Sequence, residues 1–273
     1  MVVPRQIVSI VIPVFNEQDG VSQLKQKLLR LNELLAERFE LELIFVDDGS
    51  RDSTVPVLMD EFKDSAFRYK IVEHGVNRGV GAAFRSGFQH SIGSIVCTID
   101  ADCSYSPEGL KQLLAALQST RADIAVASPY HPDGEVEGVP GWRLLLSKGC
   151  SLLYRMICPV KLYTYTSIFR AYRADVVRNV RFEGSGFVCA PEILIAAARR
   201  GYTITEVPMV LRGRSIGRSK MKIARTIGTH LSMLFGFLLP SSKPGAASVA
   251  VMARKELAKA RIARGDGKDP FAA

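Results

Sequence analysis

Short apolar runs alternate with longer segments of helical spacing along the first half of the chain. Apolar runs of this length, bounded by polar residues, are typical of buried strands. They predict strands at 6–15, 41–46, 69–72, 95–99 and 124–128. The segments between them predict helices at 21–39, 52–64, 80–91 and 107–117. Strands that alternate with helices in this way favour an α/β fold with a doubly wound, mostly parallel sheet flanked by helices.

Beyond Pro129 this alternation becomes less regular. Residues 131–141 are rich in glycine and proline and predict a mobile loop. Further elements are expected as a helix at 142–156, a strand at 166–172, a helix at 191–200 and an edge strand at 203–210. Pro208 lies within the last of these, and proline in a sheet is largely confined to edges. One main domain is therefore predicted over residues 1–222.

The chain past this domain predicts a helical appendage. Ile227, Leu231 and Leu234 share one face of an amphipathic helix over 223–240. This helix is shorter than the ~20 apolar residues that span a bilayer, and basic residues precede it, so it is predicted to lie at a membrane surface. Packing on the protein's own core or on a second copy of the chain is the alternative. Residues 241–273 predict a linker followed by a basic tail helix.

Composition narrows the kinds of partner. The net charge of +9 favours anionic partners such as nucleotides and phospholipids. Because basic residues are not interleaved with aromatic ones, nucleic acid is not an expected partner. The 5 cysteines lack metal-ligand spacing and fit reduced thiols, and the first residues do not resemble a signal peptide. The expected location is therefore the cytoplasmic side of a membrane, as a peripheral protein.

Polar residues gather after four of the predicted strands. They are Asn16 and Glu17, Asp47 and Asp48, Asn77 to Gly79, and Asp100 and Asp102. Ligands of open parallel sheets bind outside the carboxyl ends of the strands, so these clusters are expected to converge on one edge. Asp100 and Asp102 can hold a hard divalent cation together with the phosphate oxygens of a substrate. A capping role for Asp100 with a solvated Asp102 is the alternative.

As an ordered set, these motifs resemble those of inverting GT-A glycosyltransferases of the dolichol-phosphate mannosyltransferase type. The matching segments are 11–17, 46–52, 77–83, 100–108, 169–172, 200–202 and 206–208. The resemblance covers about residues 6–225 and implies a GT-A-like fold, a nucleotide-sugar donor, Mg²⁺ or Mn²⁺, and a polyprenyl or dolichyl phosphate acceptor. GDP-mannose is the leading donor, with UDP-glucose and UDP-GlcNAc as alternatives.

The resemblance also implies roles for individual residues. Those expected to bind the nucleotide are Pro13, Asn16, Glu17, Asp47, Asp48, Asn77, Arg78 and Gly79. Asp100 and Asp102 would hold the metal and the diphosphate of the donor. Ser104 stands where some relatives carry a further metal-side Gln. Arg170 would be catalytic, although Ile168 replaces the Gly of the Ser-Gly-Phe-Arg pattern.

The choice of acceptor follows from the scarcity of bases. A hydroxyl acceptor needs a general base, and the predicted acceptor-side helix offers only Glu192, which is also ordinary charge placement at a helix start. A phosphate monoester is largely dianionic near neutral pH, since its second pKa is ~6, and it needs cations instead. The candidate cations are Arg143, Arg170, Arg212, Arg214, Arg218 and Lys220.

Two other functions remain open at this point. The same fold could transfer sugar to a hydroxyl of a glycan or glycolipid, with Glu192 as the base. A membrane-surface protein could instead bind nucleotide sugar without catalysis and serve a partner. The intact pair of Asp100 and Asp102 argues against the second function, whereas the effect of Glu192→Gln on the rate would distinguish the first.

Overall fold

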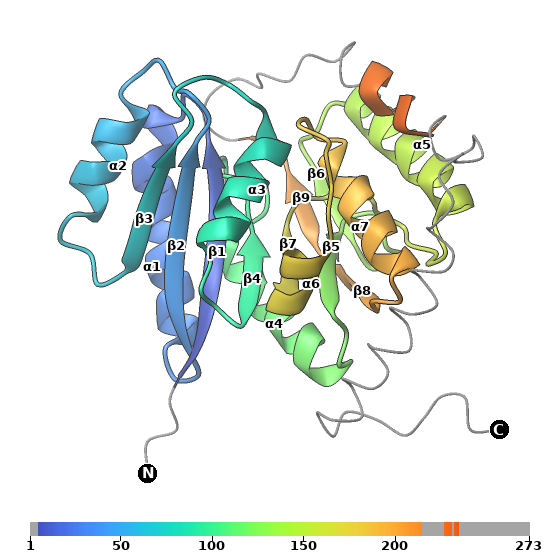
Figure 1. Ribbon diagram of the computed structural model, residues 1–273, viewed down its shortest axis with the longest axis horizontal. Helices are drawn as coiled ribbons and strands as arrows, with labels where there is room; N and C mark the ends of the chain where they lie inside the picture. Colours follow the sequence, from blue (N-terminus) through green and yellow to red (C-terminus); the bar gives the residue numbers. More distant parts are fainter. Residues whose placement is uncertain (1–4, 215–226, 231, 235–273) are drawn as a thin grey trace.

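The computed structural model describes residues 5–214, 227–230 and 232–234. A seven-stranded sheet runs through it in the order β3-β2-β1-β4-β7-β5-β8 (Figure 1). Its strands are β1 (Gln6–Val14), β2 (Phe39–Asp47), β3 (Arg68–Glu73), β4 (Ile95–Thr98), β5 (Ile124–Ser128), β7 (Arg170–Arg173) and β8 (Ile204–Pro208). Only β7 runs antiparallel to its neighbours among these strands. The prediction of a mostly parallel α/β sheet is confirmed.

Helices cover both faces of the sheet (Figure 1). They are α1 (Val21–Leu35), α2 (Thr54–Phe62), α3 (Val80–His90), α4 (Leu110–Ser119), α5 (Gly141–Ile157), α6 (Ala174–Asn179) and α7 (Cys189–Arg199), with short 3₁₀ helices η1 (Gln18–Gly20) and η2 (Pro107–Gly109). Alternate side chains of β1 pack into the hydrophobic clusters on opposite faces of the sheet. Ile10 and Ile12 join the cluster under α1, α2 and α4, whereas Val11 joins the one under α3, α6 and α7.

Several predicted boundaries change for non-local reasons. The first helix ends at Leu35, because Phe39 already pairs with Gln6 at the start of β2. The predicted strand at 166–172 begins only at Arg170, and α6 was not predicted. These limits depend on which strand lies alongside, and that information is absent from a local window of sequence.

The stretch 131–141, predicted as a mobile loop, contains a strand. Its β6 (Glu135–Glu137) pairs in parallel with β9 (Val210–Arg212). The predicted edge strand at 203–210 is correspondingly divided into β8 and β9, with Met209 between them. The prediction was wrong because a three-residue strand with two glutamates has no hydrophobic run, and only its distant partner makes it a strand.

The described part of the predicted appendage packs on the protein. Residues 227–230 and 232–234 are helical and lie beside α5 (Figure 1). His230 and Leu234 are buried, and the hydroxyl of Tyr154 on α5 lies 2.6 Å from Nδ1 of His230. The described residues thus pack on α5, in line with the alternative of packing on the protein's own core, and contact of the rest of 223–240 with a membrane stays a prediction. The 241–273 tail lies outside the described residues.

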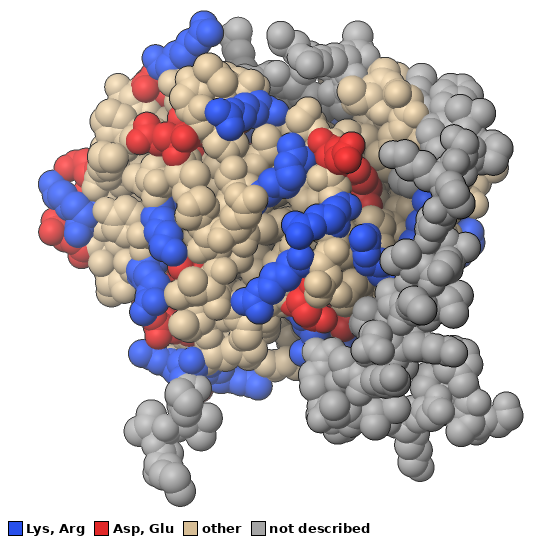
Figure 2. Space-filling model, in the orientation of Figure 1, with Lys and Arg blue, Asp and Glu red and all other residues tan. Residues whose placement is uncertain are grey.

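Charge and hydropathy add two observations. Lys and Arg side chains are interspersed with Asp and Glu across the viewed face (Figure 2). Within residues 5–214, 227–230 and 232–234, no helix combines the length and the hydropathy needed to cross a bilayer. Because charges of both signs are mixed on the face seen in Figure 2, binding of anionic partners is better explained by a particular site than by a uniformly basic surface.

Candidate active site

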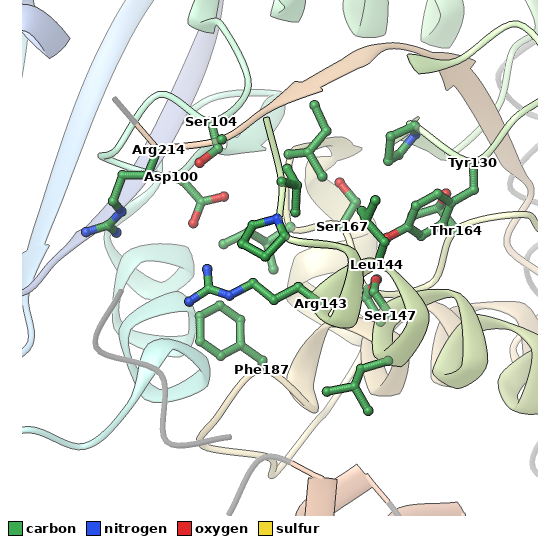
Figure 3. Close-up of a pocket in the computed structure, with 18 of the residues that line it drawn as sticks. Asp100, Ser104, Tyr130, Arg143, Leu144, Ser147, Thr164, Ser167, Phe187 and Arg214 are labelled. Atoms are coloured by element: carbon green, nitrogen blue, oxygen red, sulfur yellow. The ribbon is translucent and has the colours of Figure 1, made fainter. Parts of the chain in front are cut away.

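A cavity of about 560 Å³ lies beyond the carboxyl ends of β4 and β5 (Figure 3). One wall is the loop after β4, with Asp100, Asp102 and Ser104. A second wall is α5, which contributes Arg143, and further residues come from 164–168 and 211–214. The cavity therefore joins the predicted metal site to a predicted cation from a different part of the chain.

Alternation of buried and open positions directs both aspartates into the cavity. Ile99, Ala101 and Cys103 are buried in the core beneath α1 and α4, whereas Asp100 and Asp102 between them line the cavity. Cys103 adopts a left-handed conformation with a φ of 55°, and Oδ1 of Asp102 accepts the N–H of Ser104 at 2.9 Å. This turn presents both carboxylates on one side.

The acidic pair fits a divalent cation. Burial raises the pKa of Asp100 well above its usual range, and the neighbouring charge of Asp102 raises it further. No side chain or N–H of the described residues donates a hydrogen bond to the Asp100 carboxylate. A bound cation would relieve both the repulsion and the unmet acceptor capacity. Since the described residues form no cluster of three or more His, Cys, Asp or Glu, further ligands would come from substrate or water.

Arg214 lies against this acidic site. Its Nε donates to Oδ2 of Asp102 at 2.8 Å, and its Nη1 donates to Oε1 of Glu17 at 3.1 Å. Burial alone would lower the pKa of Arg214, but the charges of Asp102 and Glu17 outweigh it and raise that pKa. The structure thus brings together a predicted metal ligand, a predicted nucleotide ligand and a predicted phosphate ligand.

The predicted nucleotide residues after β2 hold loops together. Asp48, 4% exposed, accepts the N–H groups of Arg78 and Gly79 at 2.8 and 2.7 Å. It also bonds to the ring of His74 at 2.9 Å. Asp47 accepts the N–H of Gly49 at 3.1 Å within its own turn. The structure therefore shows loop positioning by both aspartates, and direct contact with the nucleotide stays a prediction.

The other residues predicted to bind the nucleotide lie at the ends of β1 and β3, and they too are placed by contacts within the protein or exposed to solvent. Asn16, with a φ of 51°, accepts the N–H of Arg51 at 2.7 Å and so ties two strand-end loops together. Pro13 pairs opposite Val46 near the end of β1. The side chains of Asn77 and Arg78 are exposed. These residues lie outside the lining of the cavity, so their part in nucleotide binding also stays a prediction.

The glycines of the 79–81 segment serve packing. Gly79 has a φ of 90°, and a Cβ there would lie 2.3 Å from the carbonyl oxygen of Ser185. A Cβ on Gly81 would lie 1.9 Å from the carbonyl oxygen of Gly184. The N–H of Gly81 bonds to Ser185 at 2.7 Å. The loop at 184–185 therefore fills the space beside both glycines, and contact of Gly79 with the nucleotide stays a prediction.

Arg170 is not a site residue in this structure. Its side chain is 1% exposed and does not line the cavity. The guanidinium donates to the carbonyl oxygens of Ala190 at 2.7 Å and Tyr165 at 2.8 Å. Its place in β7 directs it under α7, together with Tyr172. The residue therefore links two loops from within the core, and its predicted role in catalysis or phosphate binding stays a prediction that this position does not support.

Glu192 is likewise committed to the protein's own backbone. Its carboxylate accepts the N–H groups of Glu183 at 2.9 Å and Gly184 at 2.8 Å, and it does not line the cavity. This position gives no support to Glu192 as a general base. The residue instead closes the turn that leads into α7, which agrees with the simpler helix-start interpretation.

Of the remaining predicted cations, two line the cavity and two lie outside the residues that the structure describes. Arg143 extends from α5 toward Asp100 (Figure 3), and its buried Nε has no hydrogen-bond partner among the described atoms. Arg212 lines the cavity but pairs with Glu137 at 2.8 Å. Arg218 and Lys220 lie outside the residues that the structure describes. Arg143 is thus the cation whose bonding capacity is least used.

Comparison with known proteins decides the family. The model of the family described as "Glycosyl transferase family 2" matches residues 9–181. This chain belongs to glycosyl transferase family 2. The prediction of a glycosyltransferase is thereby confirmed, and the strand-end motifs of the donor side fall within the matched range.

Three curated relatives of this family 2 glycosyltransferase act on related lipids, according to their names. Polyprenol monophosphomannose synthase of Mycolicibacterium smegmatis is 29% identical over 224 residues, which cover 80% of this chain and 82% of that protein. Dolichol-phosphate mannosyltransferase of Pyrococcus furiosus is 30% identical over 84% of this chain and 62% of its own length. Undecaprenyl-phosphate mannosyltransferase of Micrococcus luteus is 30% identical over 77% and 86%.

Solved structures confirm the GT-A-like fold. Glucosyl-3-phosphoglycerate synthase from Mycobacterium tuberculosis, in complex with Mn²⁺, UDP and phosphoglyceric acid, gives a TM-score of 0.65 at 19% identity. The match covers 87% of this chain and 80% of that one. The same synthase with Mg²⁺ and UDP gives a TM-score of 0.61. At this identity the likeness establishes the arrangement of the chain and leaves the substrates of this transferase to be argued from its own site.

One wall of the transferase's cavity escaped prediction. It carries the hydroxyl groups of Tyr130, Ser147, Thr164 and Ser167 (Figure 3). Oγ of Ser147 lies 2.7 Å from Oγ1 of Thr166, which ties α5 to the 164–168 segment. Single Ser and Thr residues carry no distinctive spacing, so the sequence offered no signal for this wall.

Proposed function

We propose that this family 2 glycosyltransferase transfers mannose from GDP-mannose to a polyprenyl phosphate with inversion, using Mg²⁺ or Mn²⁺. The observation that carries the proposal is the content of one cavity: a carboxylate pair, the cation Arg143 and an extensive apolar lining. The names of the curated relatives support the mannosyl group and the lipid phosphate. The acceptor phosphate oxygen forms a bond to C1 of the sugar as the bond from C1 to the diphosphate breaks, which releases GDP.

The donor end is assigned to the loop after β4. Asp100 and Asp102 would hold the cation, with Ser104 beside them. When bound, such a cation neutralises charge on the departing diphosphate as a Lewis acid. The crystallisation of structural neighbours with Mn²⁺ or Mg²⁺ supports this assignment. Glu17 and Arg214 complete the polar surroundings of the diphosphate.

The acceptor end is assigned to Arg143. A guanidinium can grip two phosphate oxygens at once, and the buried Nε of Arg143 has no partner within the described structure. Among the described lining residues the carboxylates are only Asp100 and Asp102. His230 also lines the cavity but is 5% exposed and bonded to Tyr154. This shortage of bases favours an acceptor that is already an anion.

The membrane-facing surface is assigned to α5. Leu145, Leu152 and Met156 are 75%, 64% and 74% exposed and share one side of this helix. Lys148 and Arg155 are also exposed on α5, and a basic residue near an anionic leaflet contributes ~1 kcal/mol. Because the opposite side of α5 lines the cavity, a lipid phosphate could enter from the bilayer. The enzyme would then be peripheral, on the cytoplasmic side.

A partition assay tests the function. The protein is incubated with Mg²⁺ or Mn²⁺, polyprenyl phosphate and radiolabelled GDP-mannose, and in parallel with UDP-glucose or UDP-GlcNAc. Label is expected in the organic phase with GDP-mannose alone. Glu192→Gln should retain the transfer, because its carboxylate serves the loop at 183–184. Absence of labelled lipid with every donor, or label on a hydroxyl acceptor that is lost in Glu192→Gln, would contradict the proposal.

A further inference from the structure

At the acidic end of the cavity, the Arg214 side chain pairs with the carboxylate that the proposed metal would need. This ion pair has to change before the transfer reaction can proceed. Its guanidinium bridges Asp102 at 2.8 Å and Glu17 at 3.1 Å. The three side chains are 23%, 13% and 15% exposed, so these ion pairs are screened from solvent. In sequence, Arg214 is 112 residues from Asp102 and 197 from Glu17. The contact is therefore a property of the tertiary structure.

Both oxygens of Asp102 are engaged. Oδ1 accepts the N–H of Ser104 at 2.9 Å, and Oδ2 accepts Nε of Arg214 at 2.8 Å. The first bond belongs to the turn that shapes the loop. The second joins two side chains, the guanidinium of Arg214 and the carboxylate of Asp102. It can therefore be exchanged for a metal contact without disturbing the turn. Arg214 and a divalent cation consequently compete for the same carboxylate.

The backbone just before Arg214 is anchored. The N–H of Arg212 bonds to the carbonyl of Ser104 at 2.9 Å, and the N–H of Gly213 bonds to Glu137 at 2.8 Å. A Cβ on Gly213 would lie 2.3 Å from the carbonyl oxygen of Gly138, so β6 and β9 are in close contact there. Exchange can therefore take place by movement of the Arg214 side chain, without separation of β9 from β6.

We propose that Arg214 is an internal counter-cation of the donor site, which neutralises Asp102 and Glu17 before the donor binds and is then exchanged for the metal. This inference rests on the proposed metal-dependent function. Once released, the Arg214 guanidinium is beside the diphosphate and can pair with it. Metal alone has to displace Arg214 without compensation, whereas metal with a nucleotide diphosphate offers Arg214 a new anion. Metal and donor therefore bind with positive coupling.

The test measures Mn²⁺ affinity without any nucleotide. Free Mn²⁺ is followed by its electron paramagnetic resonance signal during titration of the wild type and of Arg214→Gln. Removal of the competing cation should tighten Mn²⁺ binding by about fivefold or more, within the usual range of coupling between sites. Arg212→Gln is the matched control, because Arg212 pairs with Glu137 and does not contact Asp102. Its Mn²⁺ affinity should equal that of the wild type.

Further variants keep the outcome decisive. Arg214→Lys retains one charge but lacks the planar fork that reaches both carboxylates, so an intermediate affinity is expected, and thermal unfolding checks that each variant is folded. Equal or weaker Mn²⁺ binding in both Arg214 variants would overturn the inference. If the wild type still binds Mn²⁺ and transfers sugar in that case, the proposed function survives. If neither the wild type nor Arg214→Gln binds Mn²⁺, the metal site itself fails.

Discussion

The donor side and the acceptor side of the cavity differ in how their polar groups are satisfied. On the donor side, side-chain oxygens accept backbone N–H groups of neighbouring loops: the Asp48 carboxylate accepts that of Gly79, and the Asn16 amide oxygen accepts that of Arg51. On the acceptor side, Arg143 keeps a buried Nε without a partner in the described chain, and Leu145 of the same helix is 75% exposed.

This difference indicates two kinds of binding. Hydrogen bonds hold the loops of Asp48 and Asn16 in place before any ligand arrives, whereas the Asp100 carboxylate accepts no hydrogen bond from the described side chains or N–H groups. A buried donor without a partner, or an exposed apolar stripe, is more stable when something covers it. Asp100 and Arg143 point toward the space between the two sides (Figure 3), where the sugar would pass from one substrate to the other.

Among the changes to the donor side, Asp102→Asn should cause the largest loss of transfer activity. Loss of one charge from the acidic pair weakens the metal site, and transfer should fall by about 10³-fold or more. The partition assay with labelled GDP-mannose measures the loss. The N–H of Ser104 can still donate to the amide oxygen, so circular dichroism should show an unchanged fold. Retained transfer would contradict the metal assignment.

The acceptor side is tested by Arg143→Gln. Loss of a charge-assisted contact with phosphate should lower kcat/KM for polyprenyl phosphate by about 10- to 100-fold, or ~1.5–3 kcal/mol. The KM for the nucleotide sugar should stay the same, because Arg143 belongs to the acceptor end. An equal loss for both substrates would move Arg143 to the donor side and remove the distinction.

Arg170 provides the structural counterpart of Arg143. Arg170→Met leaves the carbonyl oxygens of Tyr165 and Ala190 without their donor, so the free energy of unfolding should fall by about 2–4 kcal/mol. Urea denaturation measures the change, with Arg38→Met, at an exposed hydrogen bond to Gln118, as the control. A fully stable but inactive Arg170→Met enzyme would restore Arg170 to the site.

The membrane-facing side of α5 is tested by charge. The double change Leu145→Asp and Leu152→Asp should weaken binding to anionic phospholipid vesicles by about tenfold or more, since both apolar side chains would lose their burial in the interface. Leu29→Asp with Leu34→Asp on α1, where these leucines are 39% and 50% exposed, is the matched control, because it adds the same two negative charges. Vesicle sedimentation measures binding, and an equal effect of the control would point to net charge alone.

The smallest expected effect concerns His230. Burial lowers the pKa of His230 in the folded state, so the unfolded chain takes up the proton more readily, and stability should fall as pH drops below ~6.5. The difference in Tm between wild type and His230→Gln should therefore shrink from pH 7.5 to pH 5. A constant difference would show that the contact with Tyr154 does not depend on protonation.

Local pattern alone determined the parallel sheet and the acidic pair. Short buried runs identify β1, β2, β4 and β5, and the alternation of Ile99, Ala101 and Cys103 with Asp100 and Asp102 already directs both carboxylates to one side. These signals lie within a few neighbouring residues. Since the apolar run of a buried strand and the polar residues of the turn that follows it are both local features, a sequence can specify them without reference to the rest of the chain.

Tertiary structure decided the rest of the site. The strand character of β6 depends on β9, the burial of Arg170 depends on α7, and the carboxylate of Glu192 is taken by the turn at 183–184. Arg214 meets Glu17 across 197 residues of sequence. A charged side chain pairs with the nearest opposite charge or unmet carbonyl in space, and nearness in space is what a linear sequence does not record.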